Sequence, residues 1–232
     1  MSEINQLSPS DSDFWQRLDA LLAWDSVSDT AVNDTVNQII RDIRARGDAA
    51  LGRWLRETLV AQGIPVLAEE RPFDHGVWLP FKCIWPAAPL PVFQLSLCVR
   101  EGGPWHLALG EALAPLREAG VLIVGSGGIT HNLGEIHWHA PEGQAASWAV
   151  EFMTALEQTL EAGDREALCH PWTLPHGRRA HPTLEHYLPF LVALGAAGAQ
   201  GLAPQHRNWM FGTLALHAYG ADALPSIPAA RT

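Results

Sequence analysis

Histidines are the residues of this chain best suited to chemistry, and none of the eleven lies before His75. His131 follows a Gly/Ser loop at 125–128, which itself follows four apolar residues at 121–124. A short apolar run bounded by glycines predicts a buried strand. Ligands of α/β proteins bind at polar turns just past the carboxyl end of such strands. Because neutral imidazole is a common metal ligand, His131 is a candidate metal ligand. The alternative is a hydrogen-bonded histidine beside a strand.

Two further histidines stand in polar settings that favour a role in a site. His186 comes four residues after Pro182, and a proline suits the first turn of a helix. His186 would then lie one turn into that helix and could point toward a site; the alternative is a histidine on a helix surface. His75 follows Asp74 and is a candidate general acid or base, with an ordinary loop histidine as the alternative.

Several other kinds of site are excluded. The 125–128 loop, GSGG, has neither the dinucleotide-binding nor the P-loop spacing, and Ser126 does not stand in a nucleophile elbow. The three cysteines are odd in number and widely spaced, so neither a disulfide framework nor a thiolate zinc site is expected. A net charge of −10 with a single lysine argues against a nucleic-acid partner.

The chain also lacks the patterns of membrane and secreted proteins. No apolar run approaches the ~18–20 residues that span a bilayer. Its first residues have neither the basic patch nor the apolar run of a secretory signal. We therefore expect a cytoplasmic protein.

The spacing of apolar residues, together with the capping residues, glycines and prolines between them, predicts the elements that would position these residues. We expect an α/β fold, with a partial mixed or parallel sheet flanked by helices and preceded by an N-terminal helical arm at 1–52. The α/β domain would occupy 53–232. A strand at 91–97, a helix at 105–119 and a strand at 121–124 predict a parallel, right-handed crossover. The other predicted elements are helices at 49–61, 147–162 and 182–197 and strands at 64–67 and 209–219.

Five blocks in this order resemble one enzyme family. They are FDHG at 73–76, VFQLSL at 92–97, GSGGITHNL at 125–133, HPTLEHYLP at 181–189 and GTL at 212–214. From about residue 54 to 220 the chain resembles the class III, LigB-type extradiol ring-cleaving dioxygenases, and most closely their DOPA-dioxygenase-like branch.

The resemblance implies a small set of site residues and a cofactor. It implies an α/β fold and a non-haem metal, Fe(II) or alternatively Zn(II), which binds a catechol and O2. Matched by motif, His131 and His186 are the metal ligands and His75 is the acid/base residue. His181 and Thr130 stand beside them and are candidate substrate contacts.

The chain departs from the family pattern before His75. The family places a His-Gly-Ser-Pro motif and a Ser-Ala-His-Trp strand there, and both supply metal-site histidines. This chain has no histidine in that region, so we expect the activity to be impaired. Residues from about 7 to 51 resemble instead the N-terminal arm of histidinol dehydrogenases, through the RGDAAL run at 46–51. The arm carries no catalytic group of that enzyme.

Two functional hypotheses follow from these observations. The first is an extradiol dioxygenase acting on a catechol-type aromatic. The second is a catalytically inactive fusion remnant or a dimerising interaction protein. Since a sheet without its first strands exposes an edge, and exposed edges associate, we expect a homo-oligomer in either case.

Overall fold

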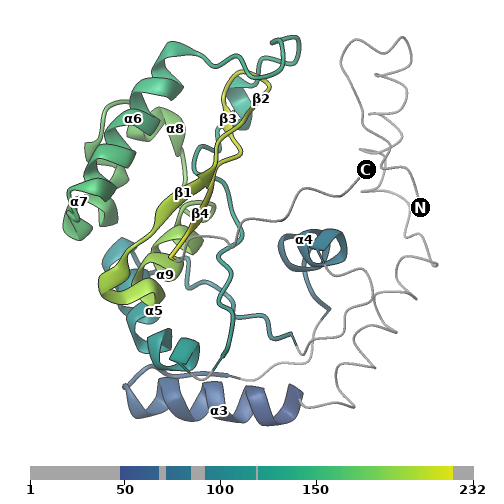
Figure 1. Ribbon diagram of the computed structural model, residues 1–232, viewed down its shortest axis with the longest axis vertical. Helices are drawn as coiled ribbons and strands as arrows, with labels where there is room; N and C mark the ends of the chain where they lie inside the picture. The colour runs from purple at the N-terminus through teal and green to yellow at the C-terminus, as the bar shows by residue number, and fades with distance from the viewer. Residues whose placement is uncertain (1–47, 68–71, 85–91, 119, 222–232) are drawn as a thin grey trace, which may run out of the picture. The chain divides into compact units, whose positions relative to one another are not determined.

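The computed structural model describes residues 48–67, 72–84, 92–118 and 120–221 (Figure 1). The predicted N-terminal arm lies outside these residues, apart from its last five positions. The chain divides into two compact units, which are described separately. One comprises Met1–Leu51 with Glu70–Gln94, and the other comprises Gly52–Glu69 with Leu95–Thr232. The predicted division into an arm and a dioxygenase-like domain stays a prediction.

The described residues of the smaller unit are 48–51, 72–84 and 92–94, which hold the first four residues of α3 (Asp48–Ala61) and the whole of α4 (His75–Ile84). Asp74 precedes this helix, and its Oδ1 accepts a hydrogen bond from the amide of Val77 at 3.2 Å. A side-chain oxygen at this position satisfies an amide that the helix itself leaves unpaired. The Asp74 amide donates to Oε1 of Gln94 at 3.0 Å. His75 is therefore the first helical residue of a capped helix.

Helices dominate the described part of the larger unit. The predicted helices at 49–61, 105–119 and 147–162 are present within a few residues of their expected ends. The α-helices are α3 (Asp48–Ala61), α5 (Gly103–Glu118), α6 (Ser147–Glu161), α7 (Arg165–Cys169), α8 (Gly177–Ala180) and α9 (Leu188–Ala197). Short 3-10 helices are η2 (Leu133–Glu135), η3 (Pro171–Thr173) and η4 (Gly198–Gln200).

Helices α5 and α9 cross at two glycines, Gly110 and Gly195. A Cβ atom on Gly110 would overlap the carbonyl oxygen of Val192, and one on Gly195 would overlap the carbonyl oxygen of Leu107. The absence of both side chains therefore brings the two backbones into direct contact. Two apolar clusters lie beside this crossing. One gathers α6, α9 and the turn before α9 around Phe152, Leu156, Tyr187 and Leu191, and the other gathers α3 and α5 around Leu55, Leu59, Leu109 and Leu113.

The predicted parallel sheet is not found among the described residues. Segments 64–67, 95–97 and 121–124 are not strands. Alternate side chains of each segment, among them Val121 and Ile123, pack on the α3–α5 cluster. Between them Leu122 and Val124 are 68% and 65% exposed. The short apolar segments thus pack one face on the core, but a strand also needs a backbone partner, which an apolar run does not specify.

The strands that form are short and antiparallel. They are β1 (Ala203–His206), β2 (Trp209–Met210), β3 (Leu214–Ala215) and β4 (Ala218–Gly220), with β1 paired to β4 and β2 to β3. We call residues 203–220 the C-terminal hairpin, drawn in yellow-green in Figure 1. The prediction of one strand over 209–219 was wrong, because the chain reverses at Phe211 and Gly212. Their φ angles of 53° and 71° lie in the left-handed region, which glycine adopts without strain.

Helix α9 begins later than the sequence predicted. It starts at Leu188, so residues 182–187 form turns and His186 precedes the helix. Pro189 explains the difference. A proline inside a helix removes a backbone hydrogen bond and collides with the preceding turn, whereas a proline in the first turn does neither. A helix that began at residue 182 would have carried Pro189 in its interior.

No helix of the described residues is long and apolar enough to cross a membrane.

The cysteines differ in burial, and this difference predicts their reactivity. All three are free; Cys83 is exposed, whereas Cys169 is buried. Burial raises the pKa of the Cys169 thiol to about 11, so little of the reactive thiolate forms at neutral pH. We expect Ellman's reagent to modify Cys83 rapidly and Cys169 only after denaturation. A Cys83→Ser variant should lose the fast phase, and rapid native labelling of Cys169 would contradict the described burial.

Candidate functional site

The structure brings His131 and His186 together. Their imidazole rings stack face to face, with ring centroids 3.4 Å apart and ring planes 12° from parallel. Both side chains are half-buried. Two histidines separated by more than fifty residues thus form one small cluster at the start of α9.

The glycine loop at 125–128 makes this approach possible. A Cβ atom on Gly127 would overlap the carbonyl oxygen of His186, and one on Gly125 would overlap the carbonyl oxygen of Pro189. The Gly128 amide donates to the carbonyl of His186 at 2.9 Å, and the His131 amide donates to the carbonyl of Ala180 at 2.9 Å. The loop glycines therefore serve the close approach of two backbones.

The surroundings of His131 favour its neutral form. Burial lowers the pKa of His131, and the neighbouring His186 lowers it further, while Glu185 opposes the shift. A neutral imidazole has the free nitrogen lone pair that a metal ligand needs. Glu185 was not among the predicted site residues. Its position directly before His186 was the sequence signal that could have indicated it.

His181 is fully buried close to this pair. Its ring Nε2 donates to the carbonyl of Ile129 at 2.6 Å, and its ring meets those of Phe152 and Tyr187 edge to face. Nδ1 is buried and has no hydrogen-bond partner among the described residues. A ring without exposed surface supports the segment that leads into His131. Its predicted contact with a substrate stays untested.

Thr130 is also buried, with 2% of its surface exposed. Its hydroxyl donates to the carbonyl of Thr213 and accepts from the amide of Ala215, both at 2.7 Å. The hydroxyl therefore ties the residue before His131 to the C-terminal hairpin. The prediction that Thr130 contacts a substrate likewise stays untested.

His75 lies in the other compact unit, at the exposed start of α4. Its backbone is held by the Asp74 cap described above. Its approach to His131, which the acid/base assignment requires, stays a prediction.

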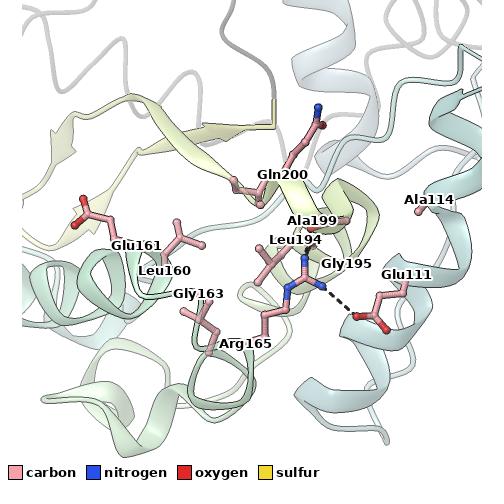
Figure 2. Close-up of a pocket in the computed structure, with 14 residues that line it drawn as sticks. Glu111, Ala114, Leu160, Glu161, Gly163, Arg165, Leu194, Gly195, Ala199 and Gln200 are labelled. Carbon is pink, nitrogen blue, oxygen red and sulfur yellow. Dashed lines mark hydrogen bonds and ion pairs between the residues drawn. The ribbon is translucent and has the colours of Figure 1, made fainter.

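A cavity of about 830 Å³ lies at the other end of α9 (Figure 2). Arg165 extends into it and bonds the Glu111 carboxylate at 3.1 Å, the Leu194 carbonyl at 3.4 Å and the Gly198 carbonyl. The guanidinium thereby satisfies carbonyls at the end of the helix. None of the candidate histidines lines this cavity, so it is not the centre of the site.

Comparison with known proteins identifies the family. The family described as the catalytic LigB subunit of aromatic ring-opening dioxygenase matches residues 24–220. The chain belongs to the LigB family. Its recognition from five sequence blocks is thereby confirmed.

Two similar proteins that are named for an activity support the same family assignment. The chain is 40% identical over 181 residues to the 4,5-DOPA dioxygenase extradiol of Portulaca grandiflora, covering 75% of this chain and 66% of that protein. For the same-named protein of Beta vulgaris, the identity is 35% over 207 residues, covering 84% and 76%. The chain thus spans about two thirds to three quarters of the length of these two LigB relatives.

A solved structure shares this LigB-like fold. The crystal structure of an uncharacterized protein from Escherichia coli K12 superposes with a TM-score of 0.65 at 30% identity. The match covers 74% of this chain and 71% of that one. The resemblance to histidinol dehydrogenase is also found, at 56% identity to the Pseudomonas putida enzyme over 48 residues. That match covers 21% of this chain and only 11% of the enzyme.

The described residues offer imidazole, a suitable donor for a LigB metal centre. They bring together two such donors, which is fewer than the centre needs. Non-haem iron sites of the facial-triad type take three protein ligands. Within residues 48–67, 72–84, 92–118 and 120–221, no group of three His, Cys, Asp or Glu side chains is placed to hold an ion. An imidazole binds a metal close to its ring plane, and nearly parallel planes do not meet at one ion. Both rings could share an ion only after at least one turned out of the stack.

The buried His181 predicts a loss of stability in acid. Burial lowers the pKa of His181 to about 4 from about 6.5 in the unfolded chain. The folded state therefore binds this proton less readily. Neutral His181 therefore contributes about 3 kcal/mol to the free energy of unfolding above pH ~6.5, and this contribution is lost as the pH falls to about 4. Urea denaturation at pH 7 and pH 4 would measure it. In a His181→Gln variant residue 181 cannot titrate, so its free energy of unfolding should depend less on pH than that of the unmodified protein. An equal dependence in both proteins would contradict the prediction.

Proposed function

We propose that the chain is an extradiol ring-cleaving dioxygenase, an oxidoreductase that acts on a catechol-type aromatic with O2. One observation carries the proposal: a LigB-family chain brings His131 and His186 into ring contact beside its glycine loop. The names of its relatives support the reaction class. Membership in the family supports a non-haem metal, with Fe(II) the first candidate and Zn(II) the alternative.

Within this proposal, each residue has a separate task. His131 and His186 would hold the metal, since burial lowers the pKa of His131 and favours its neutral form, and the glycine loop holds the two residues together. The metal, when bound, supplies the chemistry of binding the catechol oxygens and O2. His75 would move a proton during ring opening. His181 and Thr130 support the segment that carries His131.

Anaerobic loading with Fe(II), followed by oxygen and a panel of catechols, tests the proposal. We expect oxygen uptake together with a yellow ring-opened product. Circular dichroism should show that the protein is folded in the same preparation. Folded, iron-treated protein that consumes no oxygen with any catechol would contradict the proposal.

The alternative is a catalytically inactive fusion remnant or a dimerising interaction protein, which the family match does not favour. The described residues bring two imidazoles together but no third donor for an ion. Metal analysis of the purified protein separates the two functions. Stoichiometric iron or zinc that disappears in a His131→Ala variant would contradict the alternative. Size-exclusion chromatography would test the predicted homo-oligomer in the same preparation.

A further inference from the structure

The side chain of Thr130 joins the segment that carries His131 to the C-terminal hairpin. The Thr130 hydroxyl uses both its donor and its acceptor capacity, on the Thr213 carbonyl and the Ala215 amide, each at 2.7 Å. Because Thr130 is buried, water does not compete for these bonds. The backbone of the next residue, His131, is consequently placed with respect to the hairpin.

The base of the hairpin is anchored to helix α6 by the carboxylate of Glu157. Its Oε2 accepts from an Nη atom of Arg207 at 2.9 Å, and its Oε1 accepts from the Tyr219 hydroxyl at 3.0 Å. His217, buried beside them, has its Nδ1 3.6 Å from Oε1. One carboxylate thus meets both arms of the hairpin.

Backbone pairing connects these two places along the hairpin. Trp209 faces Ala215 and Met210 faces Leu214 in the β2–β3 pair, and the Leu216 amide donates to the Asn208 carbonyl at 2.9 Å. At the tip, the Ala146 amide donates to the Gly212 carbonyl at 2.7 Å. The hairpin is therefore held at its base and its tip, with Thr130 bonded between them.

We propose that Thr130 is a positioning residue that fixes the backbone of His131 beside His186 by hydrogen-bonding the C-terminal hairpin, and that Glu157 anchors this hairpin from α6. A hydroxyl that bonds one carbonyl and one amide selects a single register between two segments. The rings stack only while both backbones keep their places. The proposal rests on the proposed function only in taking His131 as a site residue.

Paired substitutions at Thr130 test the proposal. Thr130→Val keeps the shape of the side chain but removes the hydroxyl, whereas Thr130→Ser keeps the hydroxyl. The readout is the set of histidine ring signals in ¹H–¹⁵N NMR, with those of His131 identified by their loss in His131→Ala. We expect Thr130→Val to shift the ring signals of His131 and His186, and Thr130→Ser to retain them. Catechol turnover should fall by about tenfold in Thr130→Val and remain within about twofold in Thr130→Ser.

Glu157 provides a second test if Thr130→Val does not fold. Glu157→Ala should shift the His131 ring signals, whereas Glu151→Ala should not. Glu151 lies on the same helix but pairs with His176 and not with the hairpin. Ring signals of His131 that stay in place in folded Thr130→Val, or in Glu157→Ala, would overturn the proposal. Shifted signals in a protein that turns over no catechol would contradict the proposed function alone.

Discussion

Replacing either His131 or His186 with alanine is expected to lower catechol-dependent oxygen uptake by at least about 100-fold. The reason is that the two rings touch, with centroids 3.4 Å apart, and stand where the glycine loop meets the start of α9. Removing one ring therefore removes half of the described donor set. Oxygen consumption after anaerobic Fe(II) loading measures the effect, with iron content determined on the same samples.

His170 offers a matched control for both variants. It is an exposed histidine whose ring Nε2 meets the carboxylate of Glu166 at 3.1 Å. A His170→Ala variant should keep full oxygen uptake and iron content. If His131→Ala or His186→Ala kept the uptake of the unmodified protein, the candidate site would be wrong. Equal losses in all three variants would point to general damage by loss of histidine.

Substituting Gly195 with alanine is expected to lower the free energy of unfolding by about 2–3 kcal/mol. The added methyl group would overlap the Leu107 carbonyl and approach the backbone of Gly110, so helices α5 and α9 would have to separate. The atoms that the methyl group would meet belong to the backbone of α5, so no flexible side chain can absorb the shift. Urea denaturation followed by tryptophan fluorescence measures the change.

Gly102 is the matched control for this substitution. A Cβ atom on Gly102 would make only ordinary contact with the ring of Pro104, at 3.7 Å. Gly102→Ala should therefore change the free energy of unfolding by less than about 0.5 kcal/mol. Equal stability of Gly195→Ala and the unmodified protein would contradict the described helix crossing.

Local sequence determined helices α3, α5 and α6 and the choice of candidate site residues. The apolar spacing of α3, α5 and α6 predicted them because a helix satisfies its own backbone and needs only one apolar face. The blocks around His131 and His186 identified the LigB family, and the family match confirmed this. The motifs around His131 and His186 were sufficient to choose two residues that the structure brings together.

Tertiary contacts decided the rest, because each remaining feature depends on a partner distant in the sequence. Segment 121–124 has the apolar run of a buried strand, yet it forms no strand pair with another described segment. The Thr130 hydroxyl uses both its donor and its acceptor capacity on the C-terminal hairpin, more than eighty residues later in the sequence. The stacking of His131 on His186 likewise depends on backbone contacts across the glycine loop. Residue types and local periodicity thus determined which groups could act, while long-range hydrogen bonds and close packing decided where they lie.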